Sequence, residues 1–365
     1  EKAIRTLGAT GLKIFKEYDL DKDMKLDAAE FKHLYEYILC DLQETDEVYD
    51  ENTDEVLMLT AEMEPLVLSS MSQTNKNPAF GTPLFTGLVA WKKPRKPEIE
   101  LFAKEFKIFL PPNSSQMIGD AYWVVEKPTN IEELTGNRYR SPLPKTKAEK
   151  LLHKLMSMFH SRPFVTMRFS PHGGAAVIRA QNSVYLDISF RIHSEFQLNE
   201  PPNLPYWFTP AQFAGSITIA RDGSHVRDFQ LYVPNTKKLN VDMEWETEDP
   251  NAPDNHMEVD IGYLPLMRIN QRTPSSPLML ANSDGSAIDR RELRRKGKDI
   301  EVEFDQIEWS DSITEPSAAS QLEKLFFPFK QVDYLPFNEA FDRAKTEKKL
   351  VHQVLLWGAL DDQSC

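Results

Sequence analysis

The chain has little cysteine, because Cys40 and Cys365 are the only two among its 365 residues. A disulfide-rich fold needs several cysteine pairs, and a structural zinc site needs about four cysteine or histidine ligands. Two cysteines this far apart exclude both kinds of framework, and their number does not assign a redox compartment. No transition-metal site is predicted, because no carboxylate stands at ligand-like spacing from His153, His160, His172, His193 or His225.

Positive charge and long apolar runs are also scarce. The chain has 43 lysines and arginines against 56 acidic residues, a formal net charge of −13. An acidic chain repels phosphate backbones, so nucleic acid is not an expected partner. No window approaches the roughly 20 apolar residues of a membrane-spanning helix. The chain begins with Glu1 rather than methionine, so we expect a segment upstream of it.

What the chain does contain is a run of carboxylates at calcium-loop spacing. The twelve-residue loop of an EF-hand presents oxygen ligands at positions 1, 3, 5, 7, 9 and 12. The segment Asp19–Glu30 has an oxygen donor at each of these positions. The predicted ligands are the side chains of Asp19, Asp21, Asp23, Asp27 and Glu30 and the main-chain carbonyl of Lys25. The spacing therefore predicts a Ca²⁺ site.

This loop departs from the EF-hand pattern at its sixth position, where Met24 stands in place of glycine. The turn there requires a positive φ, which costs a residue with a side chain roughly 1 kcal/mol or more. We therefore expect weak binding, with a dissociation constant of ~0.1–1 mM, the range of extracellular modules. Apolar residues at helical spacing, Phe15 before the loop and Phe31 after it, predict a helix–loop–helix.

The acidic stretch 41–55 has two interpretations. A run of charges between structured segments is typical of a solvated linker. Asp50, Asn52 and Asp54 also have calcium-loop spacing. The twelfth position of that second loop is Ala61, which supplies no carboxylate, so it would be a degenerate partner of the first loop.

The middle of the chain has the two-residue period of β-strands. The segments with this period are 163–169, 175–178, 183–192, 216–219, 228–233, 239–245, 258–261 and 300–304. They predict a β-rich domain, a sandwich or barrel, preceded by a helix over 147–160. The aromatic residues Tyr206, Trp207, Phe208 and Phe213 are predicted to lie in its core.

The end of the chain has a helix pattern over 338–348, an apolar strand pattern over 350–358 and a polar turn that ends at Cys365. A strand that leads into a cysteine-bearing turn is how a thioredoxin-like redox site begins. A lone cysteine after a strand is, however, more often a small packed hydrophobic side chain than a nucleophile, so the residues alone favour that interpretation of Cys365. Cys40 is interpreted as packed. Asn113 begins an Asn-Ser-Ser triplet after two prolines, which predicts an exposed N-glycosylation site.

Long aromatic-rich segments of the chain closely resemble the selenoprotein N family. These segments are 204–213, 227–235, 239–245, 257–265, 334–345 and 356–365. The resemblance implies that selenocysteine and glycine follow Cys365, and that cysteine and selenocysteine form the redox pair. On this basis the polypeptide 1–365 carries half of the pair and is not expected to turn over by itself.

The resemblance also implies a function and a location. It predicts a calcium-responsive thiol oxidoreductase of the endoplasmic reticulum, linked to calcium homeostasis, with a membrane anchor upstream of the calcium loop. Its targets would be cysteines of luminal partner proteins, among them the sarco/endoplasmic reticulum calcium pump. The alternative is a non-enzymatic calcium-binding luminal scaffold.

Together these observations predict a multidomain α+β protein. The expected units are an EF-hand module with an acidic linker over 1–63, a β-rich middle domain over 64–330, and the truncated start of a thioredoxin-like α/β domain over 331–365.

Overall fold

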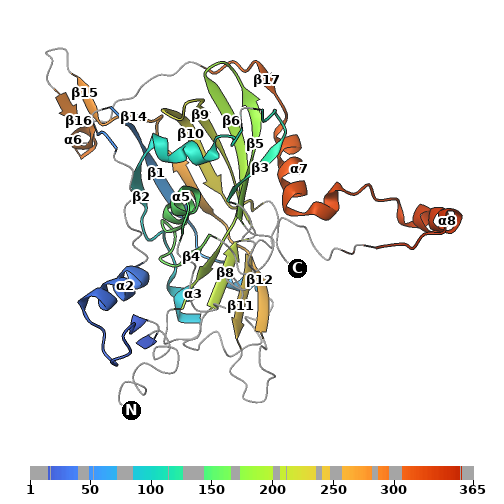
Figure 1. Cartoon of the computed structure of the whole chain (residues 1–365), viewed down its shortest axis with the longest axis horizontal. Coiled ribbons are helices and arrows are strands. Elements are labelled where there is room, and N and C mark those ends of the chain that lie inside the picture. Colours follow the sequence, from blue (N-terminus) through green and yellow to red (C-terminus); the bar gives the residue numbers. More distant parts are fainter. Residues whose placement is uncertain are drawn as a thin grey trace.

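A computed structural model describes most of the chain. The described residues are 15–16, 18–39, 49–51, 53–71, 85–113, 115–125, 144–165, 173–199, 206–210, 212–235, 241–246, 257–281, 287–295, 306–353 and 355. Within them the protein is a mixed helix and sheet structure built around one large antiparallel sheet (Figure 1).

The large sheet has ten strands among the described residues. They are β1 (Glu55–Met63), β2 (Glu98–Phe102), β3 (Ala121–Val125), β5 (Gly173–Gln181), β6 (Tyr185–His193), β9 (Phe213–Ala220), β10 (Val226–Tyr232), β13 (Met267–Gln271), β14 (Ser276–Pro277) and β17 (Asp311–Ser312). Their order is β14-β1-β13-β10-β9-β6-β5-β17, with β2 paired to β1 and β3 to β5. Every pairing is antiparallel, as expected for strands joined by short turns.

A second sheet continues from the first. It contains, in the described part of the chain, β4 (Pro163–Phe164), β7 (Glu195–Gln197), β8 (Tyr206–Pro210), β11 (Val241–Glu246) and β12 (Met257–Gly262), in the order β12-β11-β8-β7-β4. Ser194 alone separates β6 from β7, so the same run of chain passes from one sheet into the other. A small hairpin pairs β15 (Met279–Ala281) with β16 (Ala287–Asp289).

The described residues also form six helices, which differ in how they pack. They are α2 (Ala28–Leu39), α3 (Thr86–Ala90), α5 (Lys147–Met156), α6 (Arg290–Arg295), α7 (Glu315–Phe326) and α8 (Phe337–Glu347), with 3-10 turns at Leu68–Ser70, Ala103–Phe109 (η4) and Pro328–Gln331. Successive strand residues face opposite sides. In β5, Ala176 and Ile178 join the main core with α3, α5 and η4, whereas Ala175 and Val177 pack against α7.

The predicted β-rich middle and its core are confirmed. Tyr206, Trp207, Phe208 and Phe213 are all fully buried. The helix predicted over 147–160 is α5, which begins after the Thr146 cap, whose hydroxyl accepts a hydrogen bond from the Glu149 amide, and ends four residues earlier than predicted. Residues 300–304 lie outside the described residues.

The strand β1 was not predicted. It lies between β2 and β13 in the large sheet, within the segment assigned above to the EF-hand module and linker. Acidic residues precede this strand and led to the prediction of a linker. The strand itself is apolar, and its Val56, Leu57 and Leu59 are buried. Because residues 55–61 are strand, the interpretation of residues 50–61 as a second calcium loop is wrong. The predicted boundary at residue 63 falls at the end of this strand.

The C-terminal region differs from its prediction in two respects. α8 forms close to the predicted range. None of its side chains is buried, although its apolar residues were expected to pack inward, and Phe341 is 51% exposed. Residues 351–353 and 355 have no regular structure, so the strand predicted over 350–358 is absent from its described part. Figure 1 shows α8 standing away from the sheets at the end of an extended segment.

Candidate metal centre

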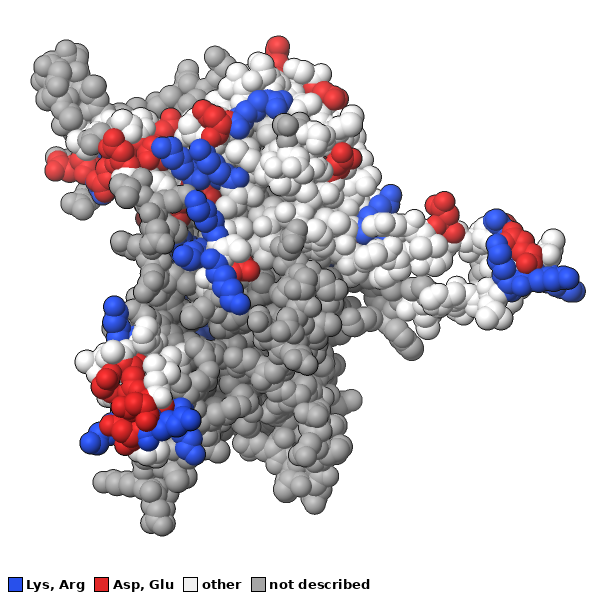
Figure 2. Space-filling model, viewed as in Figure 1, with Lys and Arg blue, Asp and Glu red and all other residues white. Residues whose placement is uncertain are grey.

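The acidic loop before α2 brings three of the six predicted calcium ligands together. Asp19, Asp21 and Asp23 each offer a carboxylate oxygen, and these oxygens lie within 4.8 Å of one another. Asp19 is 3% exposed, whereas the other two are exposed. Figure 2 shows acidic side chains gathered at the lower left, where Figure 1 places α2 and this loop.

Main-chain amides of the loop donate hydrogen bonds to these carboxylates. Asp19 Oδ2 accepts a hydrogen bond from the Met24 amide at 2.9 Å. Asp21 Oδ1 accepts from the Asp23 amide at 3.0 Å, and Asp23 Oδ1 accepts from the Lys25 amide at 2.7 Å. Side chains that bond to amides a few residues ahead are what this sequence of aspartates favours. These hydrogen bonds therefore contribute to the shape of the loop.

One oxygen of Asp19 has no such bond. Asp19 Oδ1 is buried and has no hydrogen-bond partner among the described residues. A buried carboxylate oxygen without a partner is unfavourable, because it has lost its hydration without compensation. A hard cation that prefers oxygen ligands, as Ca²⁺ does, would compensate it. The donor set of this loop therefore fits calcium.

Asp27 and Glu30 have a different role in this structure. Asp27 Oδ1 accepts from the Ala29 and Glu30 amides, both at 2.8 Å, while Glu30 Oε2 accepts from the Asp27 amide at 3.0 Å. This reciprocal pair caps the start of α2. Glu30 Oε1 also accepts from the Leu20 amide at 2.7 Å. Coordination of an ion by Glu30 would replace some of these bonds, and that exchange lowers the net affinity.

The sixth position has the backbone conformation that the sequence predicts to be strained. Met24 has a φ of 65° and is 60% exposed, and Lys22 also has a positive φ of 62°. The left-handed region costs a residue with a Cβ roughly 1–2 kcal/mol. Phe31, in the first turn of α2, is 53% exposed.

The remaining predicted site residues are less defined. Cys365 and Cys40 lie outside the described residues, so the redox assignment stays a prediction. Asn113 is exposed on the turn that follows η4, with Ser115 also exposed and Ser114 outside the described residues. Asp54, assigned above to a second loop, instead forms an ion pair with Lys104 and accepts a hydrogen bond from the Asp50 amide.

The structure also contains a histidine–carboxylate pair that the sequence did not predict. His225 Nδ1 lies 2.7 Å from Glu55 Oε2, and the Ser275 hydroxyl donates to the same oxygen at 2.6 Å. His225 and Ser275 lie 170 and 220 positions after Glu55, so no local sequence pattern predicts the cluster. It ties β1 to the start of β10.

Comparison with known proteins places this mixed helix and sheet protein in a family. The chain is 46% identical over 375 residues to selenoprotein N of Danio rerio, 42% over 378 residues to that of Mus musculus, and 39% over 412 residues to that of Homo sapiens. Each match covers 100% of this chain and 66%, 66% and 68% of the respective relative. Neither a family model nor a solved structure matches the chain.

The similarity spans the whole chain in three species, so the chain belongs to the selenoprotein N family. It covers about two thirds of the length of these curated relatives. Among the described residues, no helix combines the length and apolar character required to cross a bilayer.

Proposed function

We propose that this chain forms the calcium-binding and redox portion of a thiol oxidoreductase that acts on cysteines of luminal proteins of the endoplasmic reticulum. The observation that supports the calcium half is the buried Asp19 Oδ1, which lacks a hydrogen-bond partner among the described residues and lies beside two further carboxylates. The resemblance to the selenoprotein N family supports the redox half.

In this proposal the loop holds Ca²⁺ with the side chains of Asp19, Asp21, Asp23, Asp27 and Glu30 and the Lys25 carbonyl. The positive charge of the ion would compensate the buried Asp19 Oδ1, which has no hydrogen-bond partner among the described residues. Recruitment of Glu30 would break its bonds to the Leu20 and Asp27 amides. Because those bonds tie the loop to α2, calcium binding would shift α2 relative to the loop.

Cys365 would work with a selenocysteine that follows it in the intact protein. The selenolate attacks one sulfur of a target disulfide, and the other target sulfur leaves as a thiolate that takes up a proton. The Cys365 thiolate then attacks the selenium, which releases the second target thiol and leaves a sulfur–selenium bond. Two electrons pass to the target, and a cellular thiol reductant restores the pair.

The same proposal gives the location and partners. The protein would be anchored to the membrane by a segment upstream of the calcium loop, with Asn113 glycosylated in the lumen. Its targets would be disulfides of luminal proteins, with the sarco/endoplasmic reticulum calcium pump as a candidate. A calcium-binding scaffold without turnover is the second candidate, because the calcium loop requires no redox residue.

The test uses the full-length protein in a calorimetric calcium titration and in a disulfide-reduction assay with and without calcium. We expect a dissociation constant of ~0.1–1 mM, weakened by about tenfold in Glu30→Gln, which loses one charged ligand. Turnover should be lost in Cys365→Ser and kept in the matched control Cys40→Ser.

The following results would contradict the proposal. Sub-micromolar calcium binding, or binding unchanged by Glu30→Gln, would show that this loop is not the site. Turnover that survives Cys365→Ser would remove Cys365 from the redox pair. Absence of turnover in the wild-type protein, with calcium binding intact, would favour the scaffold.

A further inference from the structure

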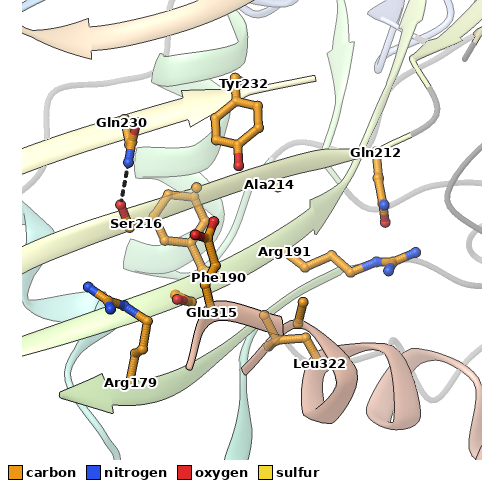
Figure 3. A pocket seen from close by; sticks show the side chains of 13 residues that line it. Arg179, Phe190, Arg191, Gln212, Ala214, Ser216, Gln230, Tyr232, Glu315 and Leu322 are labelled. Carbon is orange, nitrogen blue, oxygen red and sulfur yellow. Dashed lines mark hydrogen bonds between the residues drawn. The ribbon is translucent and has the colours of Figure 1, made fainter. Parts of the chain in front are cut away.

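A pocket lies between the outer face of the large sheet and α7 (Figure 3). Its volume is about 230 Å³. The side formed by the sheet has small residues, Ser189 of β6 and Ala214 and Ser216 of β9, and α7 passes over them with Ala319 and Leu322. Ser189 and Ser216 are paired directly across the two strands. The space stays open because these side chains are too short to reach the helix.

The serine hydroxyls face away from the core and toward this space. Along β6 and β9, Ser189 and Ser216 stand next to Phe190 and Ile217, which are fully buried. Successive side chains of a strand face opposite sides of the sheet, so the two hydroxyls face α7. Both serines are half-buried, and Ser216 Oγ accepts a hydrogen bond from Gln230 Nε2 at 2.8 Å. A hydroxyl oxygen has two lone pairs, so this oxygen can accept a second hydrogen bond.

A carboxylate and a phenol add two further oxygen-bearing groups. Glu315 lies in the first turn of α7, where the helix dipole favours a negative charge. It is exposed, and it forms no ion pair with another described residue. Tyr232 of β10 is half-buried, and Figure 3 shows its hydroxyl turned toward the Glu315 carboxylate. Burial raises the pKa of Tyr232, and the charge of Glu315 raises it further, as expected for two groups that face one space.

The two arginines that line the pocket have other partners. Arg179 forms an ion pair with Asp187. The Arg191 side chain is buried, donates from Nε to His193 Nε2 at 2.9 Å, and has its guanidinium carbon 5.3 Å from the ring centre of Phe326. Neither arginine pairs with the carboxylate on α7, so that carboxylate is left to attract a cation.

We propose that this pocket binds a small primary amine, as its ammonium ion, through the oxygens of Glu315, Tyr232 and Ser189. An ammonium group has three N–H donors and no acceptor, and each of these oxygens accepts hydrogen bonds. The charge of Glu315 strengthens its own bond to the ligand, and it repels carboxylates and phosphates. Beyond the oxygens, Ala214 and Leu322 offer apolar surface to a short aliphatic chain.

The volume of the pocket sets the size of this ligand. It equals that of on the order of eight water molecules, which accommodates an amine with a chain of about five carbons. A ligand with so few atoms makes few contacts, so we expect a dissociation constant on the order of 1 mM. The pocket uses neither the calcium loop nor Cys365, so it is independent of the function proposed above.

The experiment is ligand-observed saturation-transfer NMR, followed by titration, with n-pentylammonium as the probe. The comparison ligands each change one property of the probe. 1-Pentanol keeps the chain without the charge, tetramethylammonium keeps the charge without N–H donors, and pentanoate reverses the charge.

Each test variant has a matched control. Glu315→Gln removes the charge at an exposed position, and Glu339→Gln, exposed on α8 and outside the pocket lining, is its control. Ala319→Leu fills the pocket from an exposed position of α7. Its control is Ser317→Leu, exposed on the same helix but outside the pocket lining.

We expect n-pentylammonium to bind the wild type, Glu339→Gln and Ser317→Leu equally. Glu315→Gln should weaken binding by about tenfold, as for the loss of a charge-assisted hydrogen bond, and Ala319→Leu should abolish it. Binding of any comparison ligand as tight as that of n-pentylammonium would overturn the amine assignment, as would equal affinity in Glu315→Gln and Glu339→Gln. Absence of binding to the wild type, or binding that survives Ala319→Leu, would overturn the proposal altogether.

Discussion

Replacement of Met24 by glycine should tighten calcium binding by the loop. Met24 is held at a φ of 65°, which glycine adopts without cost and a residue with a Cβ does not. The strain is roughly 1–2 kcal/mol, offset in part by the greater flexibility of glycine before binding, about 0.5–1 kcal/mol. The net gain of about 1 kcal/mol corresponds to an approximately fivefold lower dissociation constant.

The matched control is Met24→Ala, because alanine keeps the Cβ and hence the strain but removes the rest of the side chain. Met24 is 60% exposed, so loss of its side chain alone should change little. Calorimetric titration of the wild type and both variants measures the difference. If Met24→Gly and Met24→Ala bind calcium with the same affinity, backbone strain at this position does not limit the site, and the reasoning is wrong.

Three further predictions concern the surface, the core and pH. Asn113 should carry a glycan when the protein enters the secretory pathway, so endoglycosidase should shift its gel mobility but leave Asn113→Gln unchanged. Gly215→Ala should lower the free energy of unfolding by about 1–3 kcal/mol, because the new Cβ would lie 2.3 Å from the Phe190 ring; an unchanged urea midpoint would contradict this. Burial, with the charge of Arg95, lowers the pKa of His153 from 6.5 to about 4. The unfolded chain binds the proton more readily, so stability is complete above pH 6.5 and falls as the pH drops toward 4. Between pH 7 and pH 5 this histidine should cost about 2 kcal/mol, and urea unfolding should show a loss smaller by that amount in His153→Gln.

The elements that sequence patterns predicted well are those whose signal is local. The acidic loop Asp19–Glu30 has its carboxylates at fixed spacing, and the hydrogen bonds to main-chain amides that shape it span only two to five residues. Composition alone predicted that Tyr206 and Trp207 are buried, although the strand β8 that carries them was not predicted. The turn at Met24 also follows from one position in the loop pattern.

Features that arise from distant pairing were not predictable from the same patterns. β1 is defined by its register with β13 and β2, and the acidic residues before it favoured a linker instead. The contact between Glu55 and His225 joins residues 170 positions apart. The pocket under α7 depends on which small side chains meet across β6 and β9, and strand pairing is not visible in a single sequence.

The arrangement also bears on how the proposed calcium site could act on the rest of the protein. Figure 1 places α2 and α8 on opposite sides of the large sheet, far apart in the view. Coupling between a calcium site beside α2 and a site near α8 would require a structural element with two conformations. Events at each site would have to shift the equilibrium between those conformations. The described residues between them form paired strands around fully buried rings such as Phe190 and Phe229, which resist continuous deformation. Calcium is therefore expected to act locally, by changing the surface that the loop and α2 present to a partner protein. In the disulfide-reduction assay, calcium should then change the rate with a partner protein as substrate but not the rate with a small disulfide.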